Sequence, residues 1–342
     1  MTKQQALDAF ENDDLIGIGM EADAMRRKFH PEGVASYIID RNINHTNLCT
    51  EYCSFCAFYR PMGDPEGYVL SKEEIFQKIQ ETIDLGGSGV LMQGGVNPDL
   101  KIEYFEDLFG SIKKRFEIHL HCLSAPEILT IAEVSGLTIR DTIARLRDAG
   151  LDSIPGAGAE ILDDTVRREI ARLKCTTADW IEVHRTAHAL GMRTTATMMF
   201  GCGETIEQRV NHLETIRQLQ EETGGFTAFI PWPFQPDNTP LGSRVKNEAT
   251  GVEFLKTLAI SRIYLDNIIN IQTSWVTQGL KICQLGLRFG GNDVGSVMIE
   301  ENVVRPAGTQ HSATEEDLRR MIRGAGFTPK QRDTLYRTYY LN

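Results

Sequence analysis

Three cysteines lie close together near the start of the chain, at Cys49, Cys53 and Cys56. Three thiolates at this C-x3-C-x2-C spacing can ligate three irons of a cubane iron–sulfur cluster, and no fourth soft ligand lies nearby in the sequence. One iron would then be open to another molecule, which favours catalysis, because electron carriers supply four protein ligands. A structural zinc site with His45 as fourth ligand is the alternative, although such sites usually combine two separated pairs of ligands.

Two further segments carry residues that could contact a small ligand. Gln93–Gly95 follows an apolar stretch, and its glycines either form a simple turn or let bare carbonyl oxygens approach an ammonium group. Glu160 closes a glycine-rich segment and either accepts hydrogen bonds from a ribose or pairs with Arg167 or Arg168. Both alternatives stay open at each segment.

Aromatic and histidine side chains near these segments have two interpretations each. Phe55, directly before Cys56, offers a flat face for an adenine ring, or is a core aromatic. His119 and His121 would face the same side of a strand, where two histidines can bind a metal ion. A pair of hydrogen-bonded residues that lines a barrel is the simpler interpretation. No Ser/His/Asp arrangement for hydrolysis stands out.

The composition is that of a globular enzyme or carrier. The chain has 342 residues, of which 41% are hydrophobic and 24% are charged. Its net charge of −11 and lack of a basic face predict no binding to nucleic acid. No apolar run is long enough to span a bilayer, so no membrane association is expected. Seven cysteines, an odd number, favour the reducing cytoplasm over a disulfide scaffold.

Strand-like and helix-like segments alternate along the chain, which predicts an α/β fold. Eight parallel strands would form a (β/α)8 barrel of the TIM type, and a doubly wound open sheet is the alternative. The expected strands cover residues 37–42, 89–92, 118–122, 151–154, 194–200, 226–230, 268–273 and 295–298. Residues 1–34 are expected to form a helical N-terminal arm, and residues 35–342 the barrel with a C-terminal extension of strands and helices.

The first barrel helix has the clearest signal. Ser71 and Glu74 have capping-box spacing, and the apolar residues that follow them recur on one helix face. The other expected helices cover residues 3–10, 21–29, 104–116, 138–149, 178–190, 206–223, 252–267 and 315–324.

In a barrel of this kind the carboxyl ends of all strands meet at one mouth, where such folds place their chemistry. The candidate residues follow successive strands or lie on them. In chain order they are the cysteine segment, Gln93–Gly95, Ser124, the segment 155–160, and Thr195 with Thr197. Their convergence is a second argument for an enzyme.

The cysteine motif, with an aromatic residue before its last cysteine, and the later glycine pair resemble those of radical S-adenosylmethionine enzymes. Longer segments are similar to a family within that superfamily, the cyclic dehypoxanthinyl futalosine synthases of the futalosine route to menaquinone. These segments are Asp40–Asn44, Cys56–Arg60, Pro155–Leu162, Thr194–Gly201, Phe226–Gln235, Ser274–Gln278 and Met298–Val303.

The resemblance runs from about residue 35 to the C-terminus. It departs at Ala157, where the family commonly has glycine. A methyl group is tolerated there unless the residue needs a positive φ.

The resemblance implies a 4Fe–4S cluster held by the three cysteines, with its open iron bound to the amino and carboxylate groups of S-adenosylmethionine. One electron from the cluster would generate a 5′-deoxyadenosyl radical. This radical would remove hydrogen from ribose C4′ of dehypoxanthine futalosine, and the C4′ radical would add to the benzoate ring. Loss of one electron and one proton would complete the cyclisation.

A low-potential electron donor such as flavodoxin or ferredoxin is the implied partner. The nearest alternative is an aminofutalosine synthase, which keeps the adenosyl carbon in its product. A non-catalytic iron–sulfur or zinc protein is the alternative of a different class.

The resemblance also assigns residues to roles. It places S-adenosylmethionine against Phe55, Gln93, Gly94, Gly95, Ser124, Glu160 and Lys174. The substrate carboxylate is expected at Arg60 and Arg193, and the substrate hydroxyls at Thr195 and Thr197. Glu160 and His121 are candidates for the base that removes the last proton.

Overall fold

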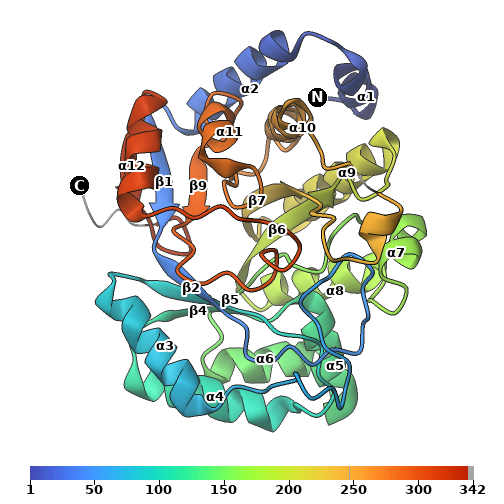
Figure 1. Cartoon of the computed structure of the whole chain (residues 1–342), viewed down its shortest axis with the longest axis vertical. Helices are drawn as coiled ribbons and strands as arrows, with labels where there is room; N and C mark the ends of the chain where they lie inside the picture. Colours follow the sequence, from blue (N-terminus) through green and yellow to red (C-terminus); the bar gives the residue numbers. More distant parts are fainter. Residues whose placement is uncertain (246, 338–342) are drawn as a thin grey trace.

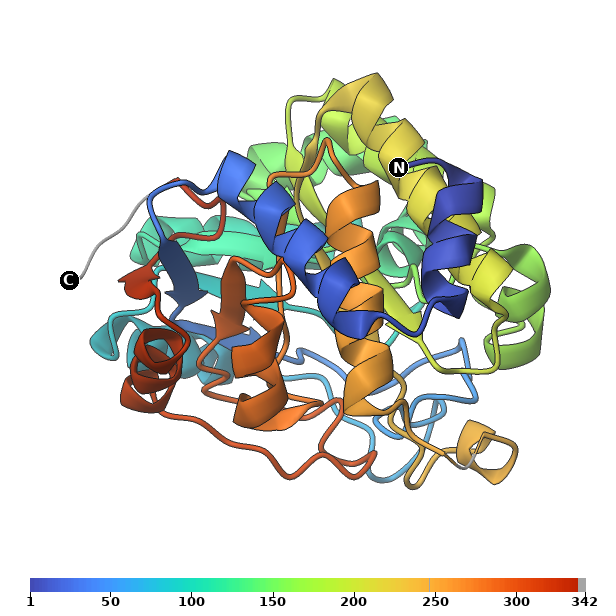
Figure 2. The same ribbon diagram turned by 90° about the horizontal axis from the view of Figure 1, so that it is seen from above.

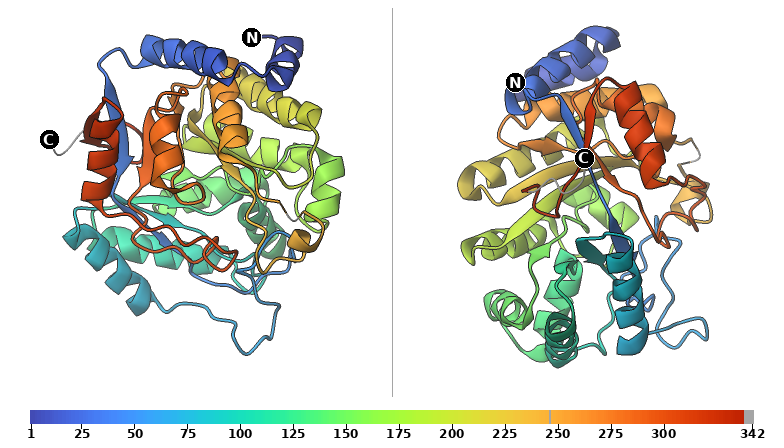
Figure 3. Two further views of the ribbon diagram at one scale, coloured as in Figure 1. Left: turned by 45° about the horizontal axis from the view of Figure 1, so that its top comes forward. Right: turned by 90° about the vertical axis from the view of Figure 1, so that its left-hand side faces the viewer.

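The computed structural model describes residues 1–245 and 247–337. Its main sheet has seven parallel strands in sequential order and curls into a half-barrel with helices outside it (Figures 1 and 3). The strands are β2 (Asp40–Ile43), β3 (Gly89–Met92), β4 (His119–Cys122), β5 (Ser153–Ile154), β6 (Arg193–Phe200), β7 (Phe226–Pro233) and β8 (Asn270–Ile271).

A smaller parallel sheet lies between the two edges of this half-barrel. Its central strand β1 (Val34–Ile38) pairs with β10 (Thr328–Gln331) on one side and with β9 (Asp293–Ser296) on the other. The chain runs from β1 almost directly into β2, and a bridge between Gln272 and Asp293 connects β9 to the residue after β8. The two sheets therefore surround one interior.

The α/β barrel-type fold is confirmed, but the expectation of eight strands in one sheet is wrong. The first expected strand, 37–42, is divided at Ile39 into β1 and β2, which pair in different sheets. The last expected strand, 295–298, overlaps β9 in the smaller sheet. Alternation of side chains reveals an extended segment, but it does not reveal a change of pairing partner within that segment.

Two helices form the N-terminal segment, as expected. α1 (Lys3–Glu11) lies beside α9 (Ile206–Thr223), and α2 (Leu15–Phe29) packs along α10 (Gly251–Tyr264), which it crosses in Figure 2. The division into an arm of residues 1–34 and a barrel of residues 35–342 stays a prediction; residues 338–342 lie outside the described part.

Most barrel helices were predicted. Ser71 caps α3 reciprocally with Glu74, as its spacing indicated. The confirmed helices are α3 (Lys72–Asp84), α4 (Ile102–Arg115), α6 (Ile139–Ala149), α8 (Thr177–Ala189), α9, α10 and α12 (Glu315–Gly324). Those not predicted are α5 (Ala125–Ser135), α7 (Asp164–Ile170), α11 (Gly279–Gly286) and the 3-10 turn Leu241–Ser243. No helix among the described residues is long and apolar enough to cross a membrane.

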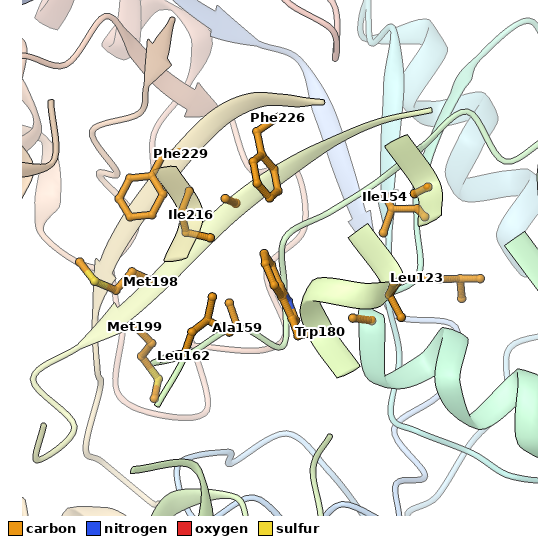
Figure 4. Close-up of a cluster of buried hydrophobic side chains, with 14 of the residues drawn as sticks. Leu123, Ile154, Ala159, Leu162, Trp180, Met198, Met199, Ile216, Phe226 and Phe229 are labelled. Carbon is orange, nitrogen blue, oxygen red and sulfur yellow. The ribbon is translucent and has the colours of Figure 1, made fainter. Parts of the chain in front are cut away.

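A buried apolar layer between the sheet and the helices fixes the central strands. Trp180 of α8 is fully buried, and its ring is stacked on Phe226 with 6.1 Å between centroids (Figure 4). Met198 of β6 belongs to the same layer. Because side chains alternate along a strand, Thr195 and Thr197 of β6 face the opposite side, which is the barrel interior.

Candidate active site in the barrel interior

One cavity of about 440 Å³ occupies the barrel interior. It extends from the loops after the strands, at the mouth, to side chains of the smaller sheet and the C-terminal segment. Most residues predicted from the sequence line it: Cys49, Cys53, Phe55, Cys56, Gln93, Gly94, Gly95, His121, Ser124, Glu160, Lys174, Thr195 and Thr197. The convergence expected at the mouth is therefore present.

The segment Cys49–Cys56, which we call the cysteine loop, is held from two sides. Thr50 donates from its backbone N–H and its hydroxyl to the carbonyl of Val96, at 3.0 and 3.2 Å. On the other side the backbone N–H and hydroxyl of Ser54 both donate to the carbonyl of Ile170 at 2.8 Å. The N–H of Leu241 donates to the Ser54 carbonyl at 2.7 Å. These bonds fix the loop with its thiols toward the cavity.

Two of the three thiols are strongly shielded from solvent. Cys49 is 8% exposed and Cys53 is 6% exposed. Burial raises the pKa of Cys53 to about 12, against the opposing effect of Lys174. A thiol of this kind gives up its proton when a metal cation binds and stabilises the thiolate. The loop thus combines a fixed backbone with sulfurs that respond to metal.

The histidine required by the zinc alternative lies elsewhere. His45 does not line the cavity; its ring packs edge-on against Phe105 with 5.6 Å between centroids. Among the described residues, no three His, Cys, Asp or Glu side chains are arranged to hold one metal ion. A cubane cluster needs no such common point, because each sulfur binds a different iron.

Gly94 and Gly95 are required by close packing against the start of the cysteine loop. A Cβ atom on Gly94 would lie 2.7 Å from His45 Cε1, and one on Gly95 would lie 2.2 Å from the Leu48 carbonyl oxygen. The structure records no hydrogen bond to the carbonyl oxygens of either glycine from the described residues. Bare carbonyls beside the thiols therefore remain available to a ligand's ammonium group, as the sequence suggested.

Glu160 and Lys174 form a buried ion pair beside the cysteines. Lys174 Nζ lies 2.6 Å from Glu160 Oε1 and 5.1 Å from the ring centroid of Phe55. Burial disfavours the ammonium, but the charges of Cys53 and Glu160 outweigh it and raise the pKa of Lys174. The pair places one fixed positive and one fixed negative group beside the cysteines. A zwitterionic ligand could pair its carboxylate with Lys174 and its donor groups with Glu160.

The alternative prediction, that Glu160 pairs with Arg167 or Arg168, is wrong, because Glu160 pairs with Lys174. Arg167 is buried and donates to the carbonyls of Gly158 and Ala159 at 3.1 and 2.6 Å, so it fixes the backbone of this loop. Positive φ falls on Gly158 and Glu160 within this loop, not on Ala157. The methyl group of Ala157 is therefore tolerated.

Thr195 and Thr197 hold the neighbouring loop from the barrel interior. The Thr195 hydroxyl accepts from the Gly156 N–H at 2.9 Å, and the Thr197 hydroxyl donates to the Gly156 carbonyl at 2.8 Å. Each hydroxyl keeps further hydrogen-bonding capacity toward the cavity. Their predicted role at the substrate hydroxyls stays a prediction.

The two histidines of β4 form a hydrogen-bonded pair, of which His121 lines the cavity. His119 Nε2 and His121 Nδ1 both contact the Ser153 hydroxyl, at 2.7 and 2.6 Å. Burial lowers the pKa of His121 to about 3, so its imidazole is neutral at physiological pH. The simpler interpretation is the correct one.

Arg60 and Arg193 do not line the cavity, in contrast to the expectation that they meet the substrate carboxylate. Arg60 is paired with Glu66, with 2.7 Å between Nε and Oε2. Arg193 is the exposed first residue of β6 and donates to the Gly224 carbonyl. It lies at the end of the strand opposite the mouth, separated from it by the length of β6 at roughly 3.3 Å per residue.

Glu127 is a site residue that the sequence reasoning missed. It is 4% exposed and lines the cavity. Its Oε1 accepts from the Gly94 N–H at 3.0 Å, and its Oε2 accepts from the N–H and hydroxyl of Ser124 at 2.6 Å. One carboxylate thus ties the loops after β3 and β4 together. The signal was present, because Ser124-x-x-Glu127 has the same capping-box spacing as Ser71-x-x-Glu74.

Glu127 gives a pH-dependent prediction. Burial raises its pKa from 4.5 to about 7, against its hydrogen bonds to Ser124 and Gly94. Between these values the folded state keeps a proton that the unfolded state has lost, so the free energy of unfolding falls as pH rises. The glutamine of Glu127→Gln cannot ionise. The variant should therefore lose the part of the pH dependence due to Glu127, a fall in the free energy of unfolding of about 1.4 kcal/mol per pH unit. Anaerobic denaturant titrations at pH 5 and 6.5 measure this slope; equal slopes in parent and variant would contradict the shift.

The cavity wall carries further polar groups that the sequence did not single out. Arg332 and Asp293 form a buried bidentate ion pair, with contacts of 2.6 and 2.9 Å. Asn42 Oδ1 and Thr277 Oγ1 are buried and have no hydrogen-bond partner among the described residues. Both residues line the cavity. Unpaired buried polar atoms are costly, so these two point to a bound polar molecule.

Five residues other than glycine at or beside the cavity have positive φ. They are Tyr52 (47°) in the cysteine loop, Leu123 (64°) before Ser124, Glu160 (42°), Met298 (51°) and Tyr336 (61°). Such conformations cost about 1 kcal/mol or more each and cluster where ligands bind. The backbone strain thus coincides with the cavity.

The side chains present fit both groups that the resemblance implied. Three thiols on one fixed loop, beside the bare carbonyls of Gly94 and Gly95, suit a 4Fe–4S cluster with a ligand on its open iron. Phe55, the Glu160–Lys174 pair and the bare carbonyls suit the aromatic base and charged groups of S-adenosylmethionine.

Comparison with protein families gives two matches that together cover most of the chain. The model of the radical SAM superfamily matches residues 43–216. The model described as the CofH/MqnC C-terminal region matches residues 223–341.

Individual relatives are similar over nearly the whole chain. Cyclic dehypoxanthine futalosine synthase of Halalkalibacterium halodurans is 48% identical over 337 residues, which cover 98% of this chain and 90% of the relative. The Streptomyces coelicolor protein of the same name is 43% identical and covers 98% and 85%. A 5-amino-6-(D-ribitylamino)uracil--L-tyrosine 4-hydroxyphenyl transferase of Methanosarcina mazei is 44% identical and covers 88% and 81%.

Solved structures share the fold at low identity. Methylornithine synthase has a TM-score of 0.70 at 19% identity and covers 96% of this chain and 94% of its own. The FeFe-hydrogenase maturase HydG of Carboxydothermus hydrogenoformans has a TM-score of 0.72 at 16% identity and covers 99% and 78%. The chain therefore belongs to the radical SAM superfamily of enzymes, which use a 4Fe–4S cluster and S-adenosylmethionine, and within it to the family that includes the cyclic dehypoxanthine futalosine synthases.

Proposed function

We propose that this enzyme cyclises dehypoxanthine futalosine to cyclic dehypoxanthinyl futalosine, a step of menaquinone biosynthesis. The observation that carries the proposal is 48% identity to a cyclic dehypoxanthine futalosine synthase over 98% of the chain. The cavity supports it, because thiols at the mouth and unpaired polar atoms elsewhere on the wall can hold a cofactor and a polar substrate in one space.

Cys49, Cys53 and Cys56 would hold the cluster at the mouth. When bound, the reduced cluster supplies one electron to S-adenosylmethionine and makes the 5′-deoxyadenosyl radical available for hydrogen abstraction. The chain's own part is to orient the reactants and exclude water. Lys174 and Glu160 would pair with the charged and ribose groups of S-adenosylmethionine.

The substrate would lie deeper, against the polar groups of the barrel wall. Asn42 Oδ1 and Thr277 Oγ1 can accept hydrogen bonds from its hydroxyls, and Thr195 and Thr197 offer their remaining capacity. Because Arg60 and Arg193 lie outside the cavity, backbone N–H groups or Arg332 are left to meet the carboxylate.

Asp40 is a better candidate for the final base than Glu160 or His121. Glu160 is neutralised by Lys174, and the low pKa of His121 makes it a weak proton acceptor. Asp40 borders the inner cavity, where burial raises its pKa to about 6 against the effects of Ser296 and Arg332. A carboxylate with such a pKa can take the ring proton at one of its oxygens near neutral pH.

Asp40→Asn tests this role. The variant should still form 5′-deoxyadenosine but yield about 100-fold less cyclised product for each deoxyadenosine, because the amide cannot accept the proton. Chromatography of both products measures the ratio. A ratio equal to that of the parent would remove Asp40 from the reaction.

The function itself is tested by a choice of substrates. The enzyme is incubated anaerobically with dithionite and S-adenosylmethionine, once with dehypoxanthine futalosine and once with 5-amino-6-(D-ribitylamino)uracil and L-tyrosine, the compounds named in the transferase relatives. Mass analysis should find a cyclised product and free 5′-deoxyadenosine only with the first. A product only with the second would assign the chain to the transferase branch, and a product that keeps the adenosyl carbon would favour the aminofutalosine synthase reaction.

We also propose that a low-potential carrier such as flavodoxin or ferredoxin supplies the electron in the cytoplasm. An odd number of cysteines, all of them free, supports a reducing compartment. Each cleavage of S-adenosylmethionine takes one electron from the cluster. Where that electron is not returned to the cluster, an external one-electron donor must replace it.

A further inference from the structure

Three exposed arginines lie close to the cysteine loop and form no close ion pair with a carboxylate of the described residues. Arg168, Arg172 and Arg244, which we call the arginine patch, make no ion pair with any described residue. About half of the other exposed arginines among the described residues are paired with a carboxylate. The chain as a whole has a net charge of −11, so three neighbouring cations without ion pairs contrast with its overall charge.

The arginine patch is built on the two segments that cover the outer side of the cysteine loop. Arg168 and Arg172 flank Ile170, whose carbonyl accepts both hydrogen bonds from Ser54. Arg244 follows Leu241, whose N–H donates to the Ser54 carbonyl at 2.7 Å. Ser54 lies between Cys53 and Cys56, so the patch is one layer of backbone away from the thiols.

A hydrogen bond joins the two segments into one surface. A guanidinium nitrogen of Arg244 donates to the Glu169 carbonyl at 3.2 Å. The Glu169 side chain is exposed and forms no ion pair with Arg168 or Arg172. Asp164 lies one helical turn before Arg168 and interacts with its charge. With Asp164 and Glu169 included, the charged side chains of this surface sum to +1.

Two large exposed side chains belong to the same two segments, Leu173 directly after Arg172 and Tyr52 two residues before Ser54. Tyr52, within the cysteine loop, is 46% exposed, and Leu173 is 54% exposed. Tyr52 has a positive φ, and its ring packs edge-on against the ring of Tyr59 with 5.7 Å between centroids. Exposed aromatic or aliphatic groups beside unpaired cations are typical of a small, transient protein interface.

We propose that the arginine patch, with Tyr52 and Leu173, is the docking site of an acidic one-electron carrier of the flavodoxin class. This inference rests on the proposed function, because the reductive cleavage of S-adenosylmethionine consumes an electron that a donor must supply. The carrier's flavin hydroquinone becomes the semiquinone as one electron passes to the cluster through the covering layer at Ser54. Negative charge on the carrier is complementary to the patch and would be repelled by the rest of this acidic chain.

The test compares a charge-reversed and a charge-neutralised variant of the reconstituted holoenzyme. The first is Arg168→Glu with Arg172→Glu, and Arg168→Gln with Arg172→Gln serves as a milder second form. The control is Lys28→Glu with Lys114→Glu, which changes the net charge equally. Lys28 and Lys114 are exposed, lack ion pairs within the described residues, and precede β1 and β4, at the strand ends opposite the mouth.

Two readouts are followed without substrate: calorimetric binding of flavodoxin, and bleaching of the cluster absorbance by flavodoxin hydroquinone or by dithionite. At low salt, the Arg168/Arg172 variants should bind flavodoxin about tenfold more weakly than the parent. Flavodoxin hydroquinone should reduce their clusters about tenfold more slowly, and both quantities should lose most of their dependence on salt. Reduction by dithionite should match the parent, and the control variant should resemble the parent in both.

Equal flavodoxin rates in parent and patch variant, an equal loss in the control variant, or a parallel loss with dithionite would each overturn the docking site. The proposed function fails separately, if clusters are reduced normally but no cyclised product forms from dehypoxanthine futalosine.

Discussion

Replacing Cys49, Cys53 or Cys56 by alanine is expected to abolish reductive cleavage of S-adenosylmethionine. Each thiol lines the cavity from one short, fixed loop, and no other cysteine among the described residues lines it. Removing one ligand from a cluster that has only three therefore removes both the metal centre and its chemistry. Deoxyadenosine formation under dithionite should fall by about 1,000-fold or more, together with iron content.

Cys175→Ala is the matched control. Cys175 is a free thiol in the same half of the barrel but does not line the cavity. Its replacement should leave iron content and deoxyadenosine formation close to those of the parent. Undiminished cleavage in any of the three loop variants would reject the assignment of ligands.

Gly95→Ala is expected to be nearly as damaging, although it adds only a methyl group. The added Cβ would lie 2.2 Å from the Leu48 carbonyl oxygen and 2.9 Å from Cys49 Cβ. Neither contact can be relieved by rotating a flexible side chain, because both involve the start of the cysteine loop. A shift of about 1 Å in that loop should lower deoxyadenosine formation about 100-fold.

Gly110→Ala provides the comparison for this glycine. Gly110 lies within α4, and its added Cβ would meet nothing closer than the Ala149 carbonyl oxygen at 4.0 Å. This variant should be as active as the parent and more stable by about 0.5–1 kcal/mol, since glycine disfavours helix interiors. A Gly95→Ala enzyme with parental iron content and activity would show that the loop does not need this close approach.

The parts of the site that could be predicted are those fixed by local sequence. The spacing of the cysteines predicted the cluster ligands. The expected ends of β3 and β4 predicted that Gly94, Gly95 and Ser124 lie at one mouth, and all three line the cavity. Glu127 could have been found by the same rule that located α3, because a serine followed by a glutamate three residues later begins α5.

The parts that could not be predicted depend on contacts between distant segments. Glu160 pairs with Lys174, fourteen positions away, across a loop whose path is set by Arg167 and its bonds to backbone carbonyls. Asp40 and Arg332 reach one cavity only because β9 and β1 close the gap in the main sheet. No periodicity within a segment reports such pairings.

Arg60 and Arg193 show the opposite error. Both lie close in sequence to segments of the site, but nearness along the chain does not give the direction of a side chain. Arg60 is satisfied by Glu66 near the surface, and Arg193 begins β6 at the far end of the barrel. A charged residue at the first position of a strand belongs with the loops opposite the mouth.

The central claim, radical cyclisation of dehypoxanthine futalosine within this cavity, is tested most directly by isotope transfer. The substrate is labelled with deuterium at ribose C4′ and incubated anaerobically with the reduced enzyme and S-adenosylmethionine. Mass spectrometry should find deuterium in the released 5′-deoxyadenosine and none at C4′ of the cyclised product. Deoxyadenosine that forms without deuterium, while the cyclised product accumulates, would contradict hydrogen abstraction from this carbon.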